Sequence, residues 1–197
     1  MKQLNNQKGF TLVEIAIVMV IIGLLLGGVL KGQQMIANAK IKNLVNHAKG
    51  LAAAIYTYQD RYKALPGDDP NAITNLAGTG CTGVANGNGD GSISEYGAAP
   101  QHLACAGLIT GTYGGSTSNA DALHSPYGTI VYIYNQTIQG KSGNLIRYDN
   151  LPPDVAKALD VELDDGNPAT GSIRANGVTD YNAAISTGTT VSVGYYY

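Results

Sequence analysis

The sequence predicts an α+β protein in which one long N-terminal helix packs on an antiparallel β-sheet head. Residues 10–65 keep a helical apolar pattern without interruption, whereas residues 128–197 contain short runs of β-branched and aromatic residues separated by turns. A long helix followed by several strands favours a layered arrangement, because the apolar face of the helix needs a sheet to cover it.

The helix opens with an apolar run that is long enough to cross a membrane. From Phe10 to Leu30 its one charged residue is Glu14. At about 1.5 Å per residue this run matches the hydrocarbon core of a bilayer, about 30 Å thick. The polar residues 1–9 before it carry Lys2 and Lys8. These lysines predict a cytoplasmic start and an exported remainder.

Residues 31–65 form the amphipathic half of the predicted helix. Apolar residues recur there at i, i+3 and i+4 spacing from Ile41 to Tyr62. Pro66-Gly67 predicts that the helix ends near Leu65, since a residue before proline avoids the α region. Four glycines in and just after the apolar half suggest either a local bend or unwinding, or close packing between helices in the membrane (Gly23, Gly27, Gly28, Gly32).

The head, residues 66–197, begins with a turn-rich stretch that extends to about Gly97. The elements expected after it are one or two helical turns at 101–109, a loop at 110–120, antiparallel strands at 128–138 and 143–148, a short helix from Pro152 to Leu159, and a last strand at 189–197. Two cysteines lie in this part, Cys81 and Cys105. An even count in an exported segment predicts a disulfide that closes a loop of about 25 residues.

Charge is distributed unevenly along the chain. Residues 1–63 hold eight Lys or Arg and two acids, whereas residues 64–197 hold four Lys or Arg and twelve acids. An acidic head repels phosphate backbones, so the composition gives no strong signal for nucleic-acid binding. The sequence contains no P-loop, GxSxG, HExxH or Rossmann motif, so we predict a protein that is not an enzyme.

The start of the chain resembles a known signal. Lys8-Gly9, then Phe10-Thr11-Leu12-Val13-Glu14 and an apolar helix, are similar to the class III signal of type IV pilins and pseudopilins. The resemblance implies the type IV pilin fold, with residues 1–9 as a leader that a prepilin peptidase cleaves between Gly9 and Phe10. It implies N-methylation of Phe10, and pairing of Glu14 with the N-terminal amine of a neighbouring subunit.

That resemblance predicts a structural subunit. A single-pass inner-membrane precursor, its head in the periplasm of a Gram-negative-type bacterium, would assemble on an inner-membrane platform with itself and other pilins. The product would be an extracellular pilus. The alternatives are a pseudopilin of a type II secretion system in a periplasmic pseudopilus, a minor or adhesive tip pilin, or a membrane-anchored enzyme or binding protein that borrows the signal.

Two stretches of the head are candidate calcium sites, and the sequence suggests no other cofactor. The first imitates an EF-hand loop but lacks its last carboxylate (Asn86, Asn88, Asp90, Ser92, with Glu95 the nearest acid). The second is a cluster of acids (Asp160, Glu162, Asp164, Asp165). The resemblance also supports the second stretch, because the major pseudopilins of type II secretion bind calcium in their heads. The alternatives are plain turns and a solvated acidic loop.

Overall fold

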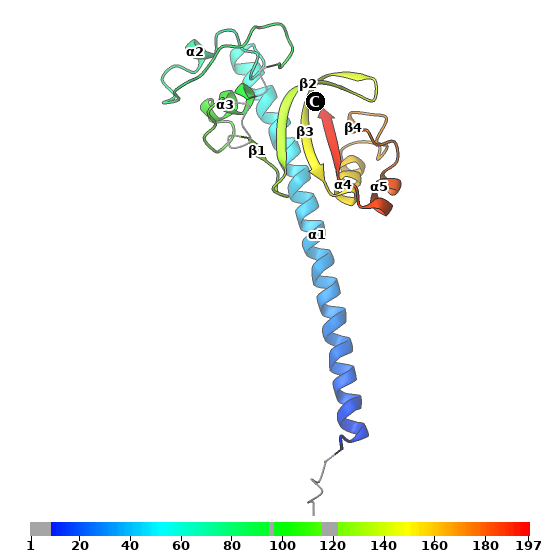
Figure 1. Ribbon diagram of the computed structural model, residues 1–197. Coiled ribbons are helices and arrows are strands. Elements are labelled where there is room, and N and C mark those ends of the chain that lie inside the picture. Colours follow the sequence, from blue (N-terminus) through cyan, green and yellow to red (C-terminus); the bar gives the residue numbers. More distant parts are fainter. Residues whose placement is uncertain (1–8, 95–96, 116–121) are drawn as a thin grey trace, which may run out of the picture. The chain divides into compact units, whose positions relative to one another are not determined.

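The computed structural model describes residues 9–94, 97–115 and 122–197 and confirms the predicted α+β class. Helix α1 (Leu12–Tyr62) precedes a five-stranded antiparallel sheet, as Figure 1 shows. The chain divides into two compact units, Met1–Ala39 and Lys40–Tyr197. The first unit contains the apolar part of α1, and the second contains the remainder of α1 together with the sheet.

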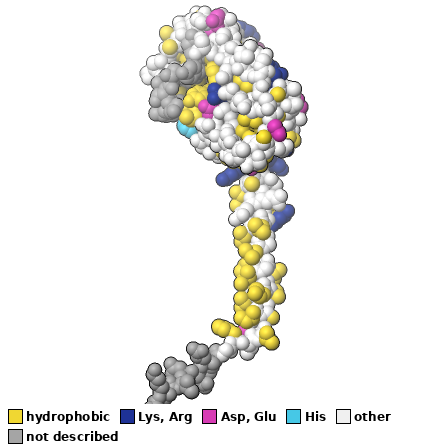
Figure 2. All heavy atoms as spheres, turned by 45° about the vertical axis from the view of Figure 1, so that its right-hand side comes forward, with side chains coloured by type: hydrophobic (Ala, Val, Ile, Leu, Met, Phe, Trp, Pro, Cys, Tyr) yellow, Lys and Arg dark blue, Asp and Glu magenta, His cyan; other side chains and the backbone are white. Residues whose placement is uncertain are grey.

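The apolar part of α1 is exposed along its whole length. Every residue from Phe10 to Leu30 is exposed, and Figure 2 shows this stretch as a surface of hydrophobic side chains. The helix is long and apolar enough to cross a membrane. It stays helical through all four glycines, so the predicted local unwinding is not observed. Close packing of other helices at these glycines remains a prediction.

In the second unit, one face of α1 enters the core. Most of its buried residues follow the predicted spacing (Leu44, Val45, Ala48, Leu51, Ala52, Ile55, Tyr58), and Ala54 is buried in addition. They share a cluster with sheet residues such as Ile133, Ile146 and Val193. The helix ends at Tyr62, three residues before the predicted Leu65. Lys63 adopts a left-handed conformation with φ 56°, which stops the helix one turn before the proline.

The sheet has the strand order β1-β2-β3-β5-β4. The strands are β1 (Leu123–His124), β2 (Ile130–Ile138), β3 (Lys141–Leu151), β4 (Ile173–Asn176) and β5 (Val191–Tyr196). The predicted hairpin of β2 and β3 is confirmed, with Ile133 opposite Ile146. Strand β3 begins at Lys141, two residues before the predicted start at 143, because Gln139 and Gly140 both adopt positive φ and close a two-residue loop.

Among the described residues, four shorter helices complete the second unit. They are α2 (Ala72–Asn75), α3 (Ala98–Cys105), α4 (Pro153–Leu163) and α5 (Tyr181–Thr187). Helix α4 starts where predicted, runs one turn further than Leu159, and adds Val155, Ala156 and Leu159 to the core that α1 enters. Both helices therefore pack into one core on the same face of the sheet.

Candidate functional site

The predicted cleavage site lies just ahead of the helix. Gly9 and Phe10 are exposed and lie outside the helix, because α1 begins at Leu12. The rest of the predicted leader, residues 1–8, lies outside the described residues. An extended, exposed peptide bond can enter a protease active site, whereas a helical one must first unfold. Cleavage at this bond and methylation of Phe10 stay predictions.

Glu14 forms a capping box with Thr11 at the start of α1. The backbone N–H of Thr11 donates to Glu14 Oε2 at 2.9 Å, and the Thr11 hydroxyl donates to the same oxygen at 2.8 Å. In return, the Glu14 N–H donates to Thr11 Oγ1 at 3.2 Å. This reciprocal pair satisfies N–H groups that a helix start otherwise leaves open. The carboxylate is thus turned back toward Phe10, the predicted new N-terminus.

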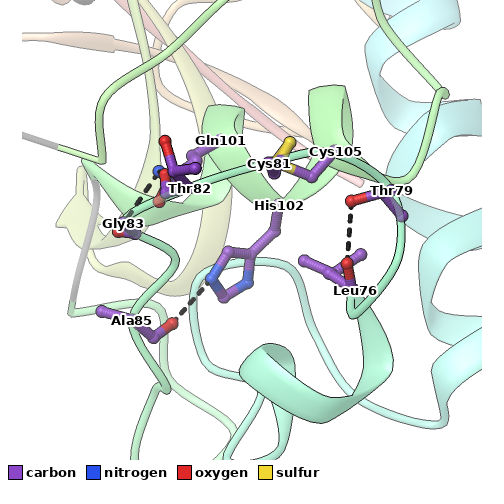
Figure 3. Close-up of a disulfide and its surroundings, with 9 residues drawn as sticks. All are labelled: Leu76, Thr79, Cys81, Thr82, Gly83, Ala85, Gln101, His102 and Cys105. Carbon is purple, nitrogen blue, oxygen red and sulfur yellow. Dashed lines mark hydrogen bonds between the residues drawn. A yellow bond between two sulfur atoms is a disulfide. The ribbon is translucent and has the colours of Figure 1, made fainter.

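The disulfide predicted from the cysteine count is present in the head. Cys81 and Cys105 are bonded, with Cα atoms 5.8 Å apart and a sequence separation of 24. Figure 3 shows that the bond joins the turn-rich stretch after α1 to the last residue of α3. It closes a loop about as long as expected, and so limits the unfolded states of the stretch between the two cysteines.

A buried histidine is hydrogen-bonded to the backbone of the same turn-rich stretch. His102 Nδ1 accepts from the Gly67 N–H at 2.9 Å. Its Nε2 lies 2.9 Å from the Ala85 carbonyl, a contact that Figure 3 shows. These contacts fix the neutral tautomer with its hydrogen on Nε2. Burial lowers the pKa of His102, although the Ala85 carbonyl and the charge of Asp69 oppose that shift. Sequence reasoning assigned His102 no role, because one histidine without spaced partners shows no pattern.

Two buried aspartates organise the turns around His102. Asp68 accepts the backbone N–H groups of Gly89 and Gly91 at 2.7 and 2.8 Å. Asp69 accepts the Tyr58 hydroxyl at 2.8 Å, which links the loop to α1. Gly87 passes so close that a Cβ there would lie 2.4 Å from Asp68 Cα. The sequence signal that could have pointed to them is the Asn-Gly and Asp-Gly run, whose backbone N–H groups need hydrogen-bond acceptors.

The side-chain oxygens of the EF-hand-like stretch accept backbone N–H groups, both within the stretch and from α2. Asn86 Oδ1 accepts from the Ile73 N–H, and Asp90 Oδ1 accepts from the Ser92 N–H. Asn88 is hydrogen-bonded to Asp90 through both its amide atoms. Glu95, the proposed last ligand, lies outside the described residues. Calcium binding at this stretch stays a prediction, and the observed contacts are those of stacked turns.

The second acidic stretch brings three of its four acids together. Ligand atoms of Asp160, Asp164 and Asp165 all lie within 4.8 Å of one another. Glu162 is exposed and does not join them. It follows Asp160 by two positions in α4, so the two side chains point about 200° apart around the helix axis. Within the described chain, none of the three forms an ion pair with a lysine or arginine.

These carboxylates also accept hydrogen bonds from their own loop. Asp160, which is fully buried, accepts from the Gly166 N–H and the Tyr181 hydroxyl at 2.9 and 2.8 Å. Burial raises the pKa of Asp160 despite both donors. Three carboxylates at this separation fit the oxygen-ligand preference of Ca²⁺, whose charge would offset their repulsion. Calcium binding here stays a prediction, since the hydrogen bonds already order the loop.

Comparison with known proteins identifies the start of the chain. Residues 4–30 match the family described as the prokaryotic N-terminal methylation motif. This motif is the class III prepilin signal of type IV pilins and pseudopilins. No curated protein and no solved structure matches the chain. The match therefore covers Gly9, Phe10 and Glu14 together with the exposed apolar helix, and it ends before the head begins.

Proposed function

We propose that this chain is a type IV pilin, a structural subunit that is cleaved between Gly9 and Phe10 and polymerises through the first half of α1. The observation that carries the proposal is the coincidence of the methylation motif with a helix that is exposed from Phe10 to Leu30. A continuous apolar surface of this kind needs lipid or other copies of the helix to cover it.

Hydrophobic burial alone does not select the filament over the membrane. Lipid tails are about as apolar as leucine, so a helix that leaves the bilayer for a filament gains little from burial itself. Close packing has to supply the gain, and the glycines at 23, 27 and 28 have nothing within 4 Å of an added Cβ. Small residues of this kind let neighbouring helix backbones approach closely.

Glu14 supplies specificity in this proposal. In the single chain its carboxylate is satisfied by Thr11. A carboxylate at this depth in the membrane is costly unless it has a partner. After cleavage, the methylated amine of Phe10 from a neighbouring copy would offer an opposite charge in the same low-dielectric region. Such a pair sets the register between subunits.

The head fits an exported location. Its disulfide suits an oxidising compartment, and the inner-membrane precursor would keep the head in the periplasm before extrusion into an extracellular pilus. The motif implies processing by a prepilin peptidase and assembly with other pilins. The second candidate function is a pseudopilin of a type II secretion system, which the carboxylate cluster at Asp160, Asp164 and Asp165 favours.

Gene deletion in the source bacterium tests the proposal. We expect the deletion strain to lose surface filaments in electron micrographs, and a plasmid copy to restore them with this polypeptide in the sheared fraction. Filaments that persist, together with secreted enzymes retained in the periplasm, would instead support the pseudopilin function. A strain that keeps both its filaments and its secretion would refute both.

A further inference from the structure

The chain contains five steps at which a glycine follows Asn or Asp. At such a step the glycine nitrogen can attack the side-chain carbonyl of the preceding residue. At Asn the new C–N bond forms a cyclic imide, and the side-chain nitrogen leaves as ammonia. Water then opens the ring to aspartate or to isoaspartate, in which the backbone runs through the side chain. The reaction needs a glycine N–H that is free to lose its proton.

Four of the five glycine N–H groups are occupied. Gly87 donates to the Asp69 carbonyl at 2.8 Å, and Gly89 donates to Asp68 Oδ1 at 2.7 Å. Gly91, after Asp90, donates to Asp68 Oδ2 at 2.8 Å, and Gly166, after Asp165, donates to Asp160 Oδ1 at 2.9 Å. A hydrogen-bonded amide in a turn fixed by several such bonds can neither ionise nor rotate freely. The buried aspartates therefore protect these steps.

The fifth step, Asn176-Gly177, is open. Asn176 is the last residue of β4, and its pairing with Ser192 is the last of the β4–β5 ladder. Both Asn176 and Gly177 are exposed. Within the described residues, the Gly177 N–H and the Asn176 side chain have no hydrogen-bond partner. Strand β4 is also the edge of the sheet, so no further strand covers this side.

We propose that Asn176 is a site of spontaneous deamidation in the folded protein, whereas Asn86 and Asn88 are protected by the fold. Water is the only co-reactant, and ammonia leaves once for each asparagine converted. The product adds a negative charge at the edge of the sheet.

Asn176 lies between two residues whose carbonyls are hydrogen-bonded to one side chain of the β2–β3 turn. Gln139, in the β2–β3 turn, donates from Nε2 to the carbonyls of Ala175 and Val178 at 3.3 and 3.0 Å. Isoaspartate at 176 lengthens the backbone between these two carbonyls. One amide group can then no longer reach both acceptors at hydrogen-bond length, so deamidation loosens the end of β4 from the turn.

Ageing of the purified full-length chain tests the proposal. The native protein would be incubated in detergent at mildly alkaline pH in H₂¹⁸O, and then digested for peptide mass mapping. The label marks each residue that deamidated during incubation. A second sample, reduced and unfolded in denaturant, measures the intrinsic rate at all three Asn-Gly steps. The Asn176→Gln variant serves as the matched control, because glutamine cyclises more slowly.

In the native sample we expect label to accumulate at residue 176, split between two chromatographic peaks for aspartate and isoaspartate. Asn86 and Asn88 should stay unlabelled there but react in the unfolded sample at rates similar to that of Asn176. Equal labelling of all three steps in the native sample would overturn the protection by Asp68 and Asp69. An unlabelled Asn176 in the native sample, with a reactive one in the unfolded sample, would overturn the proposal itself.

Discussion

Removing the charge of Glu14 should block assembly without blocking processing. In the filament that we propose, this carboxylate pairs with the Phe10 amine of a neighbour. Removing one partner of a buried pair costs about 3–5 kcal/mol, because the other charge is left uncompensated. At 1.4 kcal/mol for each factor of ten, subunit affinity should fall roughly a hundred-fold to several thousand-fold.

Three variants separate the charge of Glu14 from its capping role. Glu14→Gln keeps an oxygen that can accept from the Thr11 N–H, Glu14→Val keeps neither charge nor acceptor, and Thr11→Ala keeps the charge but loses the hydroxyl. We expect filaments from Thr11→Ala alone, since a lost cap costs only about 1 kcal/mol.

The assay is the ratio of this polypeptide in sheared filaments to that in the membrane, with the N-terminus of each pool sequenced. Glu14→Gln should be as defective as Glu14→Val, and both should still be cleaved after Gly9. Normal filaments from Glu14→Val would refute the pairing. Normal filaments from Glu14→Gln together with a defective Glu14→Val would reduce the role of Glu14 to helix capping.

Three further predictions concern the head. Replacing Cys81 and Cys105 by serine should lower the free energy of unfolding by about 3.5 kcal/mol, because the loop they close is no longer restricted in the unfolded chain; unchanged denaturant midpoints would contradict this. Stability should fall as pH drops below the ordinary histidine pKa of 6.5, because burial lowers the pKa of His102 in the folded state and the unfolded chain binds the proton more readily. The His102→Gln variant should show a weaker fall of melting temperature with falling pH. Part of the fall should remain, because burial also lowers the pKa of His47. A variant whose melting temperature falls with pH as steeply as that of the native protein would argue against His102. Calcium bound at the carboxylate cluster should raise the melting temperature, and this rise should be reversed by a chelator and lost in Asp165→Asn. A melting temperature that calcium does not change would contradict calcium binding there and mean that hydrogen bonds alone order the loop.

The sequence predicted the parts of the fold that repeat a pattern. The face of α1 from Leu44 to Tyr58 and the β2–β3 hairpin follow helical and alternating periodicities, which burial on one side imposes. Strand β4 has four residues and α5 has seven, too few for a period to emerge. The local signals are the two caps of α5, where Asp180 accepts from the Asn182 N–H and Gly188 ends the helix with φ 67°.

Some residues of the candidate site could likewise be predicted from the sequence, whereas others could not. Gly9, Phe10 and Glu14 lie in a contiguous motif, so the sequence alone predicted them as a group, and the family match covers the same residues. The roles of Asp68, Asp69 and His102 depend on contacts between residues far apart in the sequence, such as the one from His102 to Gly67. A turn-rich stretch predicts that N–H groups are exposed to some acceptor, but it does not say which acid folds back onto them. That pairing required the structure.

The most direct test of the central claim is the intact mass and N-terminal sequence of this polypeptide in filaments sheared from the source cells. The account predicts an abundant species that starts at N-methylated Phe10 and lacks the two thiol hydrogens of Cys81 and Cys105. A species that is cleaved but confined to the inner membrane would contradict the pilus and favour a pseudopilus or a minor subunit. A chain that still carries its first nine residues would contradict the processing on which the whole account depends.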